Sequence, residues 1–132
     1  MTETSNGPPS PRFRTWMRPD GIIQVVWEPG TAIRLEDAIA STTEVAKLAG
    51  GQRRPLLVDG SATGPIDRLA RMEYARREDL SSAIALILNT PLSRLSGNFL
   101  LAVSRPKPPT RLFGDEATAV AWLSDFLPQV VA

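Results

Sequence analysis

Two short apolar runs, each bounded by turn residues, mark the centre of this chain. Residues 55–58 end at Asp59 and a glycine, and residues 83–88 end at an asparagine. Uninterrupted apolar runs of this length are typical of strands buried on both faces, as in parallel sheets. In open α/β sheets, functional residues usually follow the carboxyl ends of such strands. The segment after Asp59 is therefore the first place to look for function.

A β-hairpin is predicted before these strands. Large and polar residues alternate over 13–18, residues 19–21 (Pro-Asp-Gly) supply a turn, and residues 22–27 are rich in β-formers. This combination is typical of two antiparallel strands joined by a tight connection. Because Trp16 and Trp27 lie on opposite arms, we expect them to pack across the hairpin.

Helical spacing of apolar residues predicts four helices between and after the strands. The first covers 35–49 and ends at a double glycine, and the second covers about 67–77 with a wide charged face. The third begins at Thr90, and the last covers 116–127. In the second helix, the side chains available for burial are Ile66, Leu69, Ala70 and Met72.

A short last strand at 110–113 completes the order ββαβαβαβα. A hairpin followed by alternating strands and helices predicts an α/β fold, with a mixed sheet of four to five strands and helices packed against it. The Pro- and Ser-containing residues 1–11 are expected to be a disordered leader. Residues 12–132 are expected to form one domain.

Composition removes several classes of function. The chain has no Cys and no His, so it has no thiolate nucleophile, no zinc thiolate site and no histidine base. Its net charge of +1 gives no electrostatic case for binding nucleic acid or a membrane surface. There is no signal peptide pattern, and no apolar run approaches the roughly 20 residues of a membrane span. We expect a soluble cytoplasmic protein.

The pattern resembles the STAS domains, the fold of the sporulation anti-sigma-factor antagonist, and especially the small SpoIIAA-like bacterial proteins. The resemblance covers roughly residues 12 to 127. It rests on the hairpin from Trp16 to Trp27, the strand ending at Asp59, the helix at Asp67 and the run 83–88, and most specifically on residues 111–123, which read RLFGDEATAVAWL. It implies a SpoIIAA-like fold and a regulatory role in which the second helix docks on a protein partner, such as a regulator or an anti-sigma-like kinase.

In phosphorylated members of that family, an Asp-Ser pair opens the second helix and the Ser accepts the phosphate. Here the Asp falls on Asp67 and the Ser position falls on Arg68, which has no hydroxyl. Ser61 and Thr63 in the preceding turn are alternative acceptors. The resemblance therefore implies a module that lacks the usual phosphoacceptor or is regulated elsewhere.

The start of the second helix is also a candidate anion site, since free backbone N–H groups and the helix dipole favour negative charge there. Arg68 and Arg71 are three apart and can reach the same group. In the competing interpretation, the carboxylate of Asp67 caps the helix and the arginines are solvated. The candidate residues for binding a partner or an anion are Asp59, Ser61, Thr63, Asp67, Arg68 and Arg71.

We interpret the chain as a non-enzymatic, STAS-like regulatory or interaction module with no catalytic residue, metal or cofactor. A homodimer is also expected, because sheet edges and helix faces of small domains commonly pair. One alternative is a small-molecule or lipid-binding domain, which predicts an apolar cavity lined by Leu92, Phe99, Trp122 and Phe126. Another is an enzyme acting on an anion at Ser61, Thr63, Arg68 and Arg71.

Overall fold

The computed structural model describes residues 12–60, 66–88 and 107–128. Ten elements follow one another in these ranges. They are β1 (Phe13–Met17), β2 (Ile23–Trp27), α1 (Leu35–Ala49), β3 (Arg54–Asp59), α2 (Arg68–Arg76), the 3-10 turn η2 (Glu78–Leu80), β4 (Ser81–Ile87), β5 (Thr110–Phe113), α4 (Glu116–Leu123) and the 3-10 turn η3 (Ser124–Phe126).

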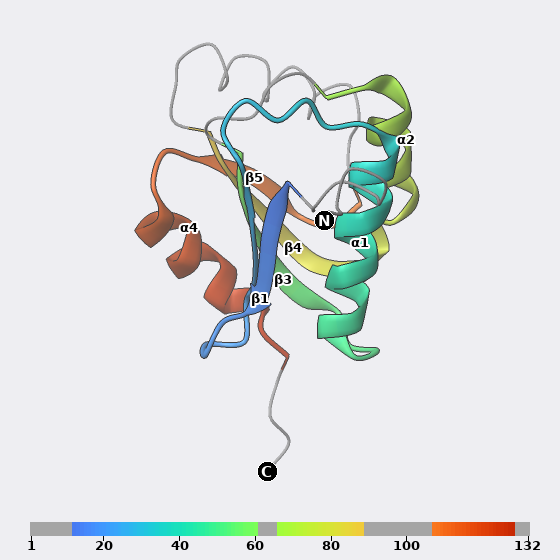
Figure 1. Cartoon of the computed structure of the whole chain (residues 1–132). Helices are drawn as coiled ribbons and strands as arrows, with labels where there is room; N and C mark the ends of the chain where they lie inside the picture. Colours follow the sequence, from blue (N-terminus) through green and yellow to red (C-terminus); the bar gives the residue numbers. More distant parts are fainter. Residues whose placement is uncertain (1–11, 61–65, 89–106, 129–132) are drawn as a thin grey trace, which may run out of the picture.

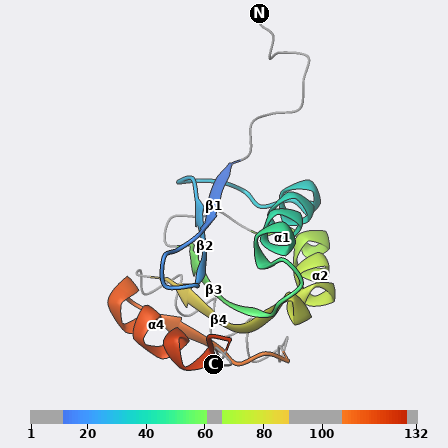
Figure 2. The same cartoon turned by 90° about the horizontal axis from the view of Figure 1, so that it is seen from below.

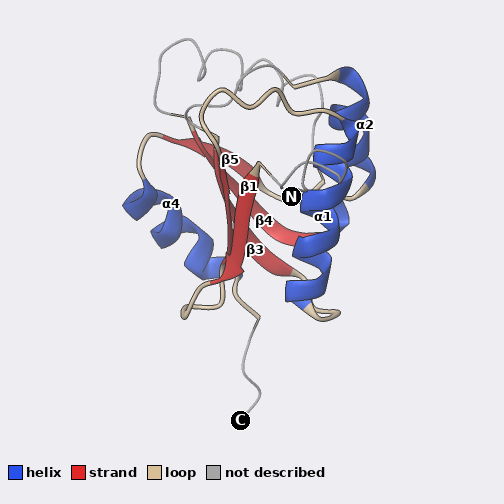
Figure 3. Ribbon diagram, in the orientation of Figure 1, coloured by secondary structure: helices blue, strands red, loops and turns tan. Residues whose placement is uncertain are grey.

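The strands form one five-stranded sheet in the order β1-β2-β3-β4-β5 (Figures 1 and 3). β1 pairs with β2 antiparallel, as the hairpin pattern predicts. The other three pairings are parallel, with Leu57 of β3 opposite Gln24 of β2 and Ala85 of β4. The predicted mixed sheet with an N-terminal hairpin is therefore confirmed, and β3 is its central strand.

Helices cover both faces of this sheet. α1 and α2 lie together on one face and α4 lies on the other, as the view from below shows (Figure 2). The first face buries Ile23, Val25 and Trp27 of β2 against α1. The second face buries Leu57 together with Ala119 and Leu123 of α4. Two apolar layers separated by a sheet explain why β3 and β4 carry apolar side chains on both faces.

The expected contact between Trp16 and Trp27 is wrong. The hairpin register places Trp27 opposite Phe13, with ring centroids 5.2 Å apart, and places Trp16 opposite Gln24. Neighbouring residues of a strand point to opposite faces, so Trp16, three positions from Phe13, points to the face away from α1. Trp27 is buried, whereas Trp16 is 37% exposed.

The burial predicted for α2 is only half right. Ile66 and Ala70 pack against the α1-side core, as expected. Leu69 and Met72 remain exposed, and the charged Glu73 is buried instead. The inward face of α2 is thus formed by Ala70, Glu73 and the half-buried Tyr74, because α2 approaches α1 through small and polar side chains.

The predicted helix from Thr90 and the disordered leader 1–11 lie outside the described residues, so the count of four helices stays a prediction. The described part of the chain contains three α-helices. Within it, no helix is long and apolar enough to cross a membrane.

Candidate functional site

The segment before α2 is hydrogen-bonded to the segment before α1. Ile33 and Ile66 form an isolated parallel bridge, and the backbone N–H of Asp67 donates to the carbonyl of Ile33 over 2.9 Å. Both helices therefore start from the same short pair of extended segments, at the end of the sheet where β3 finishes. This pairing fixes the position of the first turn of α2.

Asp59 is the last residue of β3, half-buried and paired in register with Val26 and Ile87. It lies at the carboxyl edge of the sheet, where the sequence predicts function. Ser61 and Thr63 lie outside the described residues. Their predicted role as binding residues or phosphoacceptors stays a prediction.

The carboxylate cap expected from Asp67 is wrong. Asp67 occupies the N-cap position of α2 with extended backbone angles, but its side chain makes no capping hydrogen bond. Its backbone carbonyl instead accepts the first helical hydrogen bond, from the N–H of Arg71 over 3.0 Å. The side chain of Asp67 is exposed, because the Ile33 contact orders this turn through the backbone.

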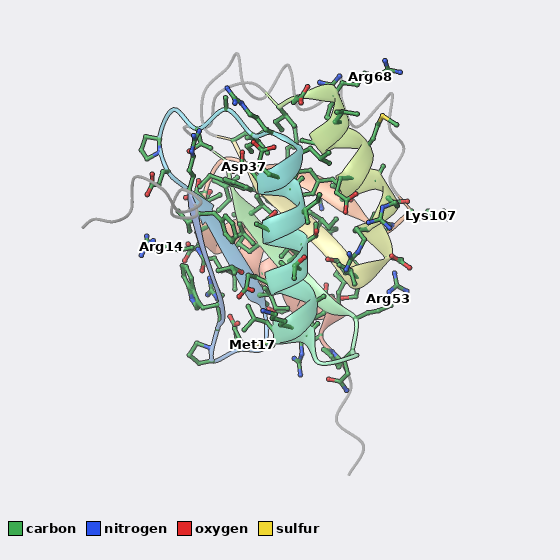
Figure 4. All side chains as sticks on the ribbon, turned by 45° about the vertical axis from the view of Figure 1, so that its right-hand side comes forward. Arg14, Met17, Asp37, Arg53, Arg68 and Lys107 are labelled. Atoms are coloured by element: carbon green, nitrogen blue, oxygen red, sulfur yellow. The ribbon has the colours of Figure 1, made fainter. Side chains whose placement is uncertain are left out.

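Arg68 and Arg71 do not converge on one group. The guanidinium of Arg71 folds back, and its Nη1 donates to the carbonyl of Ile66 over 2.9 Å. Arg68 is exposed, and its side chain makes no hydrogen bond or ion pair with the rest of the described chain. Figure 4 shows it projecting away from the molecule at the start of α2. Arg68 is therefore available to an external negative group.

The outer face of α2 combines these arginines with apolar side chains. Leu69 is 51% exposed and Met72 is 56% exposed, and Arg68 and Arg71 lie on the same side of the helix. We name this surface the α2 face; its members are Arg68, Leu69, Arg71 and Met72. From the sequence, Leu69 and Met72 were expected to be buried. Ala70 and Tyr74 lie together on one side of the helix, and neither Leu69 nor Met72 lies on that side; this spacing is the signal that was missed.

Glu73, on the inward side of α2, forms an ion pair with Arg76. Arg76 donates to its carboxylate from Nη2 over 2.8 Å and from Nε over 3.1 Å. These hydrogen bonds lower the pKa of Glu73, with a further contribution from the charge of Arg77. The carboxylate of Glu73 is therefore held by Arg76.

The two alternative functions stay predictions, because part of each expected site lies outside the described residues. Trp122 stacks on Phe113 and Phe126, with ring centroids 5.6 and 4.9 Å apart, so these aromatic side chains pack on one another. Leu92 and Phe99, the other expected lining residues of a lipid cavity, lie outside the described part. Within residues 12–60, 66–88 and 107–128, no group of three or more acidic side chains is placed to hold a metal ion.

Two solved structures are similar to this chain to different degrees. An uncharacterised DUF3478-family protein from Shewanella loihica PV-4, which has a SpoIIAA-like fold, has a TM-score of 0.62 and 14% identity, covering 84% of this chain and 91% of that one. A protein of unknown function from Arthrobacter sp. FB24 is 29% identical over 90% of this chain and 97% of that one, with a TM-score of 0.33. No curated protein matches in sequence.

The first of these likenesses shows that the chain has the SpoIIAA-like fold that its sequence predicts. The family model that matches, over residues 15–127, is described as Domain of unknown function (DUF7793). The match begins within β1, at residue 15, and covers all the later described strands and helices. This chain therefore belongs to the DUF7793 family.

Proposed function

We propose that this chain is a non-enzymatic, STAS-like regulatory module that acts in the cytoplasm and binds a protein partner through the α2 face. The observation that carries the proposal is the exposure of Leu69 and Met72 beside Arg68. Met and Arg are enriched in protein–protein interfaces relative to the rest of a protein surface, which supports this face as the docking surface.

The chemistry of the α2 face specifies the partner. Arg68 and Arg71 favour carboxylates, since a guanidinium donates to them through two N–H groups at once. Leu69 and Met72 favour apolar side chains, and Met adapts its shape to a varied surface. The partner we expect therefore presents an acidic and apolar surface, for example an amphipathic helix with carboxylates beside its apolar stripe.

This binding requires no phosphorylated serine at the start of α2. Arg68 stands where the resemblance to STAS domains places the acceptor, and it is exposed with no partner in the described chain. A fixed positive charge at this position attracts an acidic partner at all times, whereas a phosphate would repel one. The module is thus expected to be regulated by its own abundance or by its partner.

Affinity capture tests the proposal with charge-matched variants. Arg68→Glu with Arg71→Glu reverses the charge of the α2 face, and Leu69→Ser with Met72→Ser removes its apolar part. Arg12→Glu with Lys47→Glu makes the same change of charge at exposed residues of other elements. We expect the captured proteins to be lost with the first two pairs and retained with the third. An identical captured set for all proteins would show that the α2 face is not the docking surface.

A further inference from the structure

We propose that the free edge of β1 is a self-association site, at which two copies of this chain pair their β1 strands antiparallel about a two-fold axis at Thr15. β1 is the end strand of the five-stranded sheet, with β2 on one side (Figure 2). This inference does not rest on the function proposed for α2, because α2 lies over a different part of the molecule.

The hydrogen-bond pattern of the hairpin shows which backbone groups face outward. The N–H of Glu28 donates to Arg12, and the N–H of Arg18 donates to Ile22. Bonded pairs alternate along an antiparallel ladder, so the even-numbered residues of β1 bond to β2. The N–H and C=O groups of Phe13, Thr15 and Met17 consequently point away from the sheet.

Apart from the charge of Arg14, the edge of β1 carries none of the features that protect strand edges. Its five residues, FRTWM, contain no proline or lysine, and its register with β2 runs without a bulge. The opposite edge differs, because β5 has four residues and follows directly after Pro108 and Pro109. Natural sheets block unwanted pairing with proline, short strands and bulges. The unprotected edge of β1 is therefore the one suited to pairing.

The side chains of β1 are self-complementary about Thr15. An antiparallel pair centred there sets Arg14 opposite the second copy's Trp16 and Phe13 opposite the second copy's Met17. Within one chain, the guanidinium of Arg14 already lies 5.8 Å from the centroid of the Trp16 ring. In the pair it would contact a second ring across a non-bonded position, where side chains approach most closely. No like charges face each other within the five residues of β1. One position beyond them, Arg12 faces the second copy's Arg18, whose guanidinium already pairs with Asp20 and Glu116 of its own chain.

A shallow hollow between β1 and α1 leaves room for side chains of the second strand. It has a volume of about 390 Å³, and it is lined by Phe13 and Thr15 of β1 and by Ala40, Thr43 and Glu44 of α1. A second copy of β1 would direct its own Phe13, Thr15 and Met17 toward this side. Trp16, 37% exposed on the opposite face, would lose solvent contact as well.

Sedimentation of the purified full chain tests self-association, and two substitutions test the edge. We expect a mass near twice 14.4 kDa. Thr15→Pro removes an outward N–H without breaking the β2 ladder, so the dissociation constant should rise at least about tenfold. Thr15→Val removes the hydroxyl that donates to Gln24 but keeps the backbone N–H, and it should remain dimeric. A monomeric wild type, or equal dissociation constants for the two variants, would overturn the proposal.

Disulfide formation then tests the register, since the chain contains no cysteine. Opposed residues of a bonded pair have Cα atoms about 5.5 Å apart, within the range a disulfide spans. Thr15→Cys should form a covalent dimer under mild oxidation, and Ser124→Cys, exposed beyond α4, should form much less. If the wild type is a dimer but these two variants cross-link equally, the interface lies elsewhere and the proposed pairing is wrong.

Discussion

The hydroxyl of Tyr74 on α2 lies 3.0 Å from that of Ser41 on α1. The Ser41 hydroxyl also donates to the carbonyl of Ala38, one turn earlier. This hydrogen bond joins the two helices that cover one face of the sheet, and it lies beside Ala70 at their contact. The position of the α2 face therefore depends on a polar contact between α1 and α2.

Burial raises the pKa of Tyr74 from its ordinary value of 10.0 to about 12. Tyr74 is the only tyrosine of the chain, so phenolate absorbance reports on it alone. We expect the folded protein to titrate near pH 12 and the urea-unfolded protein near 10. The neutral phenol is the form the fold favours, so its stabilising contribution is complete below pH 10 and is lost as the pH rises toward 12. A single titration near 10 in the folded state would contradict the burial of this side chain.

Replacing Leu57 with Ala tests the centre of the sheet. Leu57 is fully buried in β3, in the apolar layer beneath α4. The substitution should lower the free energy of unfolding by about 2–5 kcal/mol, because it removes buried methyl groups and leaves a cavity. Urea denaturation measures the loss. Leu57→Met keeps the volume and should cost under about 1.5 kcal/mol; equal losses would mean that packing at this position is not what matters.

Sequence patterns were sufficient to locate the strands. They were not sufficient to identify which side chains of neighbouring strands contact each other. The apolar runs around Leu57 and Ala85 identify buried strands, because two helical layers demand apolar side chains on both faces. The partner of Trp27 depends on the hairpin register. The geometry of the turn at 18–22 sets that register, and composition leaves it open.

The grouping of the candidate residues into one site stays a prediction. The structure places Asp59 at the end of β3 and places the start of α2 through the Ile33–Ile66 bridge. The role of Asp67 could not be predicted, because a distant backbone contact with Ile33 orders its turn. The exposure of Met72 depends on how α2 is rotated against α1. That rotation is set by tertiary contacts such as the Tyr74–Ser41 hydrogen bond, which sequence periodicity does not reveal.

The Glu73–Arg76 ion pair should make stability depend on pH in acid. The hydrogen bonds from Arg76 lower the pKa of Glu73 below its ordinary value of 4.5. Its contribution is therefore present above about pH 4.5 and is lost as the pH falls through the lower pKa of the folded state. Glu73→Gln should reduce the melting temperature at pH 7. It should also make the melting temperatures at pH 7 and pH 3 more similar. Glu28→Gln, at an exposed position outside the helices, should leave both melting temperatures unchanged.

Gly21, in the hairpin turn, is required for its backbone angle and for its lack of a side chain. Its φ is +91°, and an added Cβ would lie 3.1 Å from both Arg54 Nη1 and Leu127 Cδ2. Its carbonyl accepts a hydrogen bond from Arg54 over 3.2 Å, so the turn, β3 and the segment after η3 meet at this point. Any substitution here strains the backbone and crowds two neighbours.

Gly51 separates these two effects. It has a φ of +90° with nothing within 4 Å of an added Cβ. Gly51→Ala should therefore cost only the strain of the left-handed backbone, about 1–2 kcal/mol. Gly21→Ala should cost more, because Arg54 must shift and its hydrogen bond to the turn is weakened. Urea denaturation of both variants measures the difference. Equal losses would show that the neighbours of Gly21 yield without cost and that backbone angle alone makes glycine necessary there.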